Sequence, residues 1–242
     1  YPVKKMLQLI DFFFKENTGF TPFSGQHFWI IVILILFGSS LIFWAKKQTQ
    51  RVQITTGNIF AFSISLTVII GSILNSYRPE FNYKEDLPLH LCSFLGLTIP
   101  LLSLTRKYLL YEVYLFLILS GTLQSLATPT EYNYLNFYYF RYWFVHGGLV
   151  IFTFYATLVY DMRPTIKSVF KAFIGVQIYT VFMFIINYIL GSNYFYTFAK
   201  PEATTLLDVF GEWPRYVLVV ELIMIPFFLL IYLPFYFTKK RD

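Results

Sequence analysis

One cysteine and three histidines are the side chains of this sequence best suited to covalent catalysis or metal binding. Cys92 is the lone thiol among 242 residues, so neither an intrachain disulfide nor a site built from several thiolates is available. A thiol becomes a strong nucleophile when a neighbouring imidazole takes its proton. Nucleophilic chemistry at Cys92 therefore depends on which of His27, His90 and His146 reaches it.

Transmembrane helices are the elements that must position these groups. Hydrophobic residues make up 57% of the chain and charged residues 13%, whereas soluble domains carry about 25% charged residues. A bilayer core is crossed by about 20 apolar residues. Seven stretches meet or approach that length, at 28–45, 58–77, 87–104, 108–128, 140–160, 169–190 and 216–237. The sequence therefore predicts an all-α, polytopic membrane protein, a bundle of seven transmembrane helices in a single domain over residues 1–242.

The placement of basic residues predicts the orientation. One set of alternate connections is strongly basic, while the opposite set has a net charge near zero. The basic set contains Lys46, Lys47, Arg51, Arg106, Lys107, Arg163, Lys167, Lys171, Lys239, Lys240 and Arg241. Basic connections face the cytoplasm, which places the N-terminus outside and the C-terminus in the cytoplasm. Residues 1–20 are expected to lie in the membrane interface as an amphipathic segment, and residues 191–215 to form an outer loop.

With this orientation, the polar residues of the spans fall at a common depth in the outer leaflet. The set comprises His27, His90, Cys92, Gln124, His146, Asn187 and Glu221. Ionisable and polar groups are costly in lipid and normally face a bundle interior or a water-filled cavity. A shared depth therefore predicts one polar cavity that opens outward.

Within that cavity, Cys92 is the candidate nucleophile. Asp86 is expected to cap the third span, which places Cys92 in the second turn from a positive helix end. His146 lies at the right height to serve as the base, with His90 as the alternative base. Glu221 could orient the imidazole, which would complete a set of thiol, base and carboxylate.

Substrate contacts are expected around the same cavity. His27, Gln124 and Asn187 lie at its level, and Lys200 or Arg215 at the rim could hold a lipid phosphate. A histidine at a helix end is also a common interfacial residue, so a purely structural role for His27 stays open.

Three local patterns give the chain a resemblance to known proteins. They are FTPFSGQH at Phe20–His27, LPLHLC at Leu87–Cys92, and an outer loop containing Asn193, Tyr194, Lys200, Pro201, Leu206, Leu207, Asp208, Gly211, Trp213, Pro214 and Tyr216. The sequence resembles the YwaF-like bacterial integral membrane proteins and, more distantly, the transmembrane protein 164 acyltransferases of animals. The resemblance implies a multi-pass protein of the bacterial plasma membrane. It also implies acyl transfer between membrane lipids through a cysteine thioester, with Cys92 as nucleophile and His146 as base.

The leading hypothesis is a membrane lipid acyltransferase or lipid hydrolase that works from the extracytoplasmic side. Its partners are membrane phospholipids; no cofactor is required and no nucleic acid is expected, and the sequence does not indicate a protein partner. One alternative is a metal-dependent membrane enzyme in which His27, His90 and His146 bind the ion. Another is a transporter of small solutes or lipids, or a receptor-like binding module, that uses the cavity without chemistry.

Overall fold

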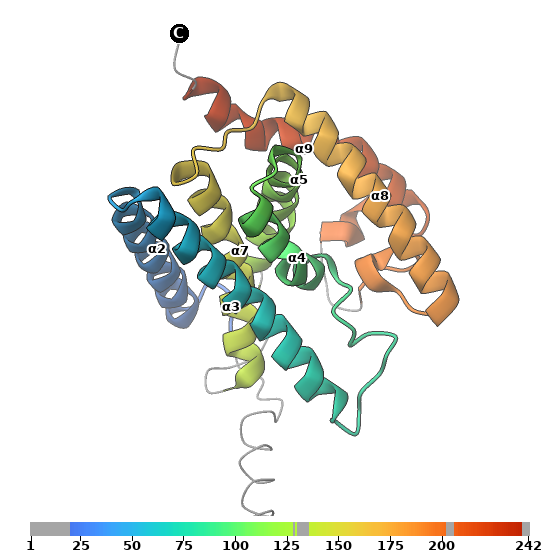
Figure 1. Ribbon diagram of the computed structural model, residues 1–242. Helices are drawn as coiled ribbons and strands as arrows, with labels where there is room; N and C mark the ends of the chain where they lie inside the picture. Colours follow the sequence, from blue (N-terminus) through green and yellow to red (C-terminus); the bar gives the residue numbers. More distant parts are fainter. Residues whose placement is uncertain (1–19, 128, 130–135, 202–205, 239–242) are drawn as a thin grey trace, which may run out of the picture.

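The computed structural model describes residues 20–127, 129, 136–201 and 206–238, and these residues form helices and connections without a β-strand (Figure 1). Its elements are α2 (Gly25–Lys46), α3 (Gln50–Ser76), α4 (Leu91–Thr105), α5 (Tyr108–Leu117), the π-helix η1 (Ile118–Thr122), α6 (Leu123–Ala127), α7 (Phe137–Leu158), α8 (Ile166–Leu190), the short 3-10 helices η2 (Tyr194–Tyr196) and η3 (Leu206–Phe210), and α9 (Arg215–Phe237). The all-α prediction is confirmed for this part of the chain. The predicted interfacial segment 1–20 lies, except for Phe20, outside the described residues.

Five helical segments are long and apolar enough to cross a membrane. They are α2, α3, the continuous segment 108–127 formed by α5, η1 and α6, α8 and α9. α4 is apolar but has only 15 residues. α7 has 22 residues and carries Arg141 in its first turns. The helices thus support a multi-pass membrane protein with five candidate spans, and the count of seven stays a prediction.

Two helix boundaries differ from the predicted ones for clear reasons. α3 begins at Gln50 rather than at residue 58, because polar residues extend the helix beyond its apolar stretch, and the Gln53 side chain donates to the carbonyls of Ala45 and Gln48. α4 begins at Leu91 rather than at residue 87. The predicted cap at Asp86 is wrong: its carboxylate accepts the Asn82 N–H at 2.7 Å within a turn.

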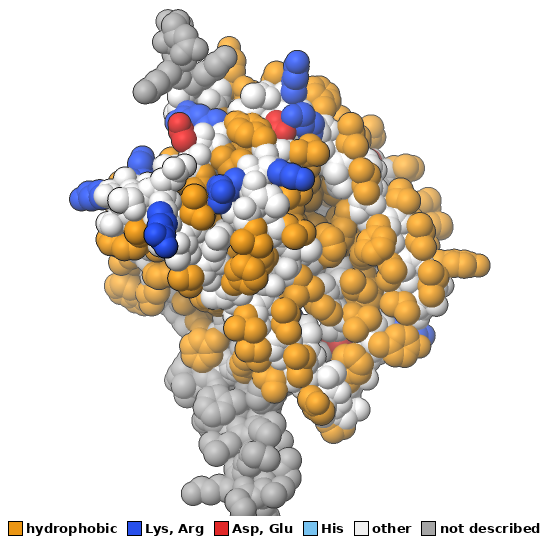
Figure 2. Space-filling view, in the orientation of Figure 1, with side chains coloured by type: hydrophobic (Ala, Val, Ile, Leu, Met, Phe, Trp, Pro, Cys, Tyr) orange, Lys and Arg blue, Asp and Glu red, His pale blue; other side chains and the backbone are white. Residues whose placement is uncertain are grey.

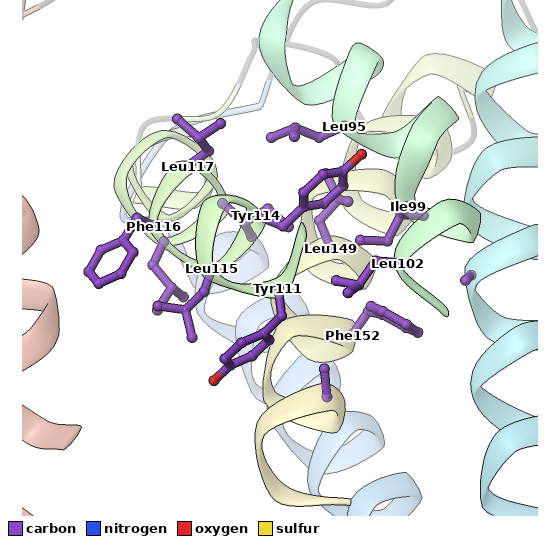
Figure 3. Close-up of a cluster of buried hydrophobic side chains, with 14 of the residues drawn as sticks. Leu95, Ile99, Leu102, Tyr111, Tyr114, Leu115, Phe116, Leu117, Leu149 and Phe152 are labelled. Carbon is purple, nitrogen blue, oxygen red and sulfur yellow. The ribbon is translucent and has the colours of Figure 1, made fainter. Parts of the chain in front are cut away.

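α7 is the central helix of the bundle and contacts α2, α3, α4 and η1, while α5 and α9 pack on α8 (Figure 1). The largest buried cluster joins side chains from α3, α4, α5 and α7, and also includes Phe228 of α9. Figure 3 shows part of this cluster, with Leu95 and Ile99 of α4 facing Leu149 and Phe152 of α7. The core thus holds α4 against α7.

The outer faces of the bundle are apolar, as expected for a surface in lipid. Leu36 of α2, Ile178 of α8 and Leu222 of α9 are among the exposed hydrophobic residues. Figure 2 shows hydrophobic side chains over most of this face, with Lys and Arg gathered at one end. At that end the Arg163 guanidinium donates to the Thr238 carbonyl at 3.0 Å. The connection between α7 and α8 and the end of α9 therefore share the basic side.

We predict that a side chain at position 57 of α3 would destabilise the protein, because the space around Gly57 is closely packed. A Cβ there would lie 2.0 Å from the Tyr160 hydroxyl and 3.1 Å from Tyr155, whereas a Cβ at Gly25 would meet nothing within 4 Å. Gly57→Ala should cost about 1–3 kcal/mol through overpacking, and Gly25→Ala should not. Thermal unfolding in detergent measures both. Equal midpoints for the two variants would contradict the packing around Gly57.

Candidate active site

Cys92 is the second residue of α4, in the first turn of the helix. Its side chain is half-buried and packs against the main hydrophobic cluster. The first N–H groups of a helix have no intrahelical acceptor, and the aligned peptide dipoles make this end positive. His90, the residue that begins the helix, provides no side-chain cap. The thiol is therefore four residues closer to the unpaired backbone donors than a cap at Asp86 would have placed it.

Gly96 sets the distance between α4 and α7. It lies one turn after Cys92, on the same face of α4. A Cβ at Gly96 would lie 3.0 Å from Val68 of α3 and 3.3 Å from Val145 of α7, so the missing side chain allows the helices to approach closely. Because Val145 precedes His146, this contact brings the imidazole to the level of the thiol.

The imidazole of His146 is held in one orientation by its own helix. Its Nδ1 lies 2.8 Å from the Tyr142 carbonyl oxygen, and its ring stacks on the Tyr142 ring at 4.1 Å between centroids. A carbonyl only accepts hydrogen bonds, so Nδ1 carries a proton, and Nε2 is the nitrogen through which the neutral ring can accept one. The His146 imidazole lies close enough to the Cys92 thiol for the two groups to interact electrostatically. The structure thus brings His146 and Cys92 together, and the role of His146 as the base stays a prediction.

Two hydroxyl groups from the segment 108–127 complete the surroundings of the sulfur. The Thr122 Oγ1 lies 3.7 Å from the Cys92 Sγ, and Ser125 is also within hydrogen-bonding reach. Thr122 belongs to the π-helix η1, where the extra residue per turn shifts the side chains relative to an α-helix. The Tyr142 hydroxyl donates to the Ser125 carbonyl, which fixes this segment to α7.

Sequence reasoning did not find Thr122 or Tyr142 as part of the site. Thr122 could have been noted from its depth in the fourth predicted span, but no residue pattern signals the π-helix. Tyr142 acts through its backbone carbonyl and its ring, and it precedes His146 by one helical turn. That spacing was readable in the sequence, whereas the contact with Ser125 depends on how the helices pack.

The structure does not place His90 or Glu221 beside Cys92 and His146. The His90 ring packs against the rings of Tyr194 and Tyr196, at 5.1 and 5.3 Å between centroids. Glu221 accepts a hydrogen bond from Gln177 of α8. The predicted orienting role of Glu221 is corrected accordingly: the Tyr142 carbonyl occupies the imidazole nitrogen that Glu221 would have needed.

His27 has a structural role at the outer end of α2. It is 5% exposed, its Nδ1 accepts the Phe23 N–H at 2.9 Å, and its Nε2 donates to the Leu126 carbonyl at 2.8 Å. Both ring nitrogens are therefore bonded within the protein, which leaves neither free to bind a metal ion, and the predicted substrate contact of His27 stays a prediction. Among the described residues no group of three or more His, Cys, Asp or Glu side chains converges as metal ligands, so the three-histidine site is not formed.

The remaining predicted substrate contacts are bonded within the protein or exposed at its surface. Asn187 is a buried hub that donates to Tyr194 and Thr197 and accepts from Ser192, so it organises the outer loop. Arg215 is exposed at the start of α9, and Gln124 is exposed on α6. The polar residues of the outer level thus form separate clusters rather than the single cavity that their depth predicts.

Lys200, the other residue expected to hold a phosphate, is engaged within the outer loop. Its ammonium lies 2.8 Å from Glu212 and 3.5 Å from Asp208. The hydrogen bond that Lys200 donates to the Glu212 carboxylate raises the pKa of Lys200 above its usual value, so the group is charged at neutral pH. The Lys200 ammonium that a phosphate would require is therefore already paired with two carboxylates.

Comparisons with known proteins add one positive finding. The model of the TMEM164 family matches residues 22–232, which include Cys92, Thr122, Tyr142 and His146. Comparison with curated proteins and with solved structures gives no match. The match agrees with the resemblance to the animal transmembrane protein 164, while the YwaF-like bacterial label stays a prediction.

We predict that the reactivity of the lone thiol depends on His146 and not on Glu221. His146→Gln removes the group that can accept the thiol proton, so alkylation of Cys92 by a small maleimide at neutral pH should slow several-fold. Glu221→Gln is isosteric and can keep its contact with Gln177, so alkylation should proceed at the wild-type rate. Intact-mass spectrometry follows both reactions. Slowing by Glu221→Gln would contradict the geometry described here.

Proposed function

The chain belongs to the TMEM164 family, and on that premise we propose that it is a membrane lipid acyltransferase or lipid hydrolase with Cys92 as nucleophile. The observation that carries the proposal is the pairing of the lone thiol with an imidazole whose Nδ1 is committed to the Tyr142 carbonyl. Such a pairing is the arrangement that activates a thiol for attack on a carbonyl carbon. Membrane phospholipids are the proposed substrates, because the thiol lies in an apolar bundle that only lipids can enter sideways.

In the first step, His146 Nε2 takes the thiol proton and the sulfur attacks the carbonyl carbon of a lipid ester. The Thr122 hydroxyl can donate to the thiolate, since it lies 3.7 Å from the sulfur. The negative oxygen of the tetrahedral intermediate can be stabilised by the first-turn N–H groups of α4, such as those of Cys92 and Ser93. When the ester C–O bond breaks, the imidazolium returns its proton to the leaving alcohol, and a thioester remains on Cys92.

In the second step, the imidazole acts again as a base. His146 removes a proton from the incoming hydroxyl group, and its oxygen attacks the thioester carbonyl. Breakage of the C–S bond regenerates the thiol with the proton from the imidazolium. If the hydroxyl belongs to a lysolipid, the result is acyl transfer; if it belongs to water, the result is hydrolysis. The chemistry at Cys92 and His146 is the same in both cases.

The proposed topology has seven spans, with α4 and α7 added to the five candidate spans. α4 and α7 each place one face in the buried core, so polar residues on that face are compatible with a transmembrane position. With the N-terminus outside, the beginning of α4 and the site lie in the outer leaflet. The proposed location is the bacterial plasma membrane, with activity on its extracytoplasmic side.

The experiment that tests this function looks for the covalent intermediate. The protein purified from membranes and incubated with phosphatidylcholine should gain the mass of one fatty acyl group, and neutral hydroxylamine should remove it because thioesters are labile to that reagent. Acyl transfer to a labelled lysophospholipid should be lost in Cys92→Ala. In His146→Gln it should fall by about 10²–10⁴-fold, the usual contribution of a general base.

A matched control uses His27, a histidine whose ring nitrogens are both bonded within the protein. His27→Gln removes a buried hydrogen-bonding ring, so it should lower the unfolding temperature without abolishing adduct formation in the protein that remains folded. Full transfer activity in Cys92→Ala would overturn the proposal. Movement of a lipid or solute across liposomes, without any adduct or new lipid product, would favour the binding or transport alternatives.

A further inference from the structure

A long apolar groove lies between α2 and α7. It has a volume of about 770 Å³ and is formed by a stripe of α2, the second half of α7, and α6. Leu123 and Leu126 of α6 line it, whereas neither Cys92 nor His146 does. The groove is therefore lined by a different set of residues from the candidate active site.

The dimensions of the groove suit a single hydrocarbon chain. Its lining on α2 runs from His27 to Lys46, about 29 Å at the helical rise per residue. This length and the almost entirely apolar lining match an extended hydrocarbon chain.

Charge is present at one end of the groove only. Of the residues that line it, Lys46 is the charged one, and it lies at the last turn of α2, at the basic end of the bundle. Lys47 and Arg51 are exposed near the same connection, and Figure 2 shows the gathering of Lys and Arg at this end. His27 closes the other end, with both ring nitrogens already bonded. An occupant should therefore be apolar along its length and anionic at the Lys46 end.

We propose that this groove binds an anionic glycerophospholipid, with its phosphate at Lys46 and one acyl chain along α2 and α7. Basic residues at a membrane surface attract anionic lipids, and Ile35, Ile42 and Phe154 provide an apolar wall for the chain. The site is distinct from Cys92 and does not rest on the proposed acyl chemistry. The Lys46 end of the groove, where the phosphate would bind, lies at the side of the bilayer opposite to the beginning of α4.

The test is native mass spectrometry of the full chain in detergent, titrated with dioleoylphosphatidylglycerol or dioleoylphosphatidylcholine. The first phosphatidylglycerol should bind more tightly than phosphatidylcholine. Lys46→Gln should weaken that binding by about fivefold, the effect of one basic residue at an anionic membrane surface. Lys47→Gln changes the net charge of the protein by the same amount, but Lys47 does not line the groove, so this variant should weaken phosphatidylglycerol binding less. Equal affinities for the two lipids, or equal losses in the two variants, would overturn the proposal.

A second pair of variants tests the groove itself. Ser39 lines the groove, whereas the adjacent Ser40 is exposed and does not. Ser39→Phe should block the first bound lipid, and Ser40→Phe should leave it unchanged, with equal unfolding temperatures as the check on folding. Binding measured in Cys92→Ala should match the wild type, which keeps this result separate from the proposed enzyme function. Unchanged binding in Ser39→Phe, or a dimer that this variant disperses, would refute the lipid site.

Discussion

The close approach of α4 to α7 at Gly96 is the contact on which the rest of the site depends. A Cβ at this position would lie 3.0 Å from Val68 of α3 and 3.3 Å from Val145 of α7, so these side chains would have to shift to admit it. Because Cys92 lies one turn from Gly96, and His146 directly follows Val145, the same contact decides whether the thiol meets an imidazole. Leu95, Ile99, Leu149 and other buried residues of the core hold this contact in place.

Most other polar groups inside the bundle are satisfied by structural partners. The buried Glu112 carboxylate accepts hydrogen bonds of 2.6 Å from Ser168 and Lys171 of α8. His27 connects α2 to α6, and Asn187 organises the outer loop. Such bonding is what an apolar interior requires, because an unpaired polar group there is costly. The pair of Cys92 and His146 differs from these groups, because its imidazole keeps a nitrogen with a lone pair next to a thiol.

The segment 118–127 contributes residues both to the candidate active site and to the apolar groove. Thr122 lies beside the sulfur, and Leu123 and Leu126 line the groove. Thr122 belongs to the π-helix, whereas Leu123 and Leu126 belong to α6. One helical segment thus takes part in the proposed covalent site and in the proposed lipid site.

Composition and hydrophobic stretches were sufficient to predict an all-helical membrane bundle, because a chain with so few charges can expose its apolar surface only to lipid. Depth also predicted that His146 lies near Cys92, and the catalytic roles of the two residues stay predictions. Depth along a helix can be read from sequence, but the direction of a side chain around the helix axis cannot, since it depends on which neighbours pack on each face. For that reason the sequence grouped His27, His90, Asn187 and Glu221 with the thiol, whereas the tertiary structure separated them. The first turn of α4, the Tyr142 carbonyl and the π-helix that carries Thr122 were decided only by packing.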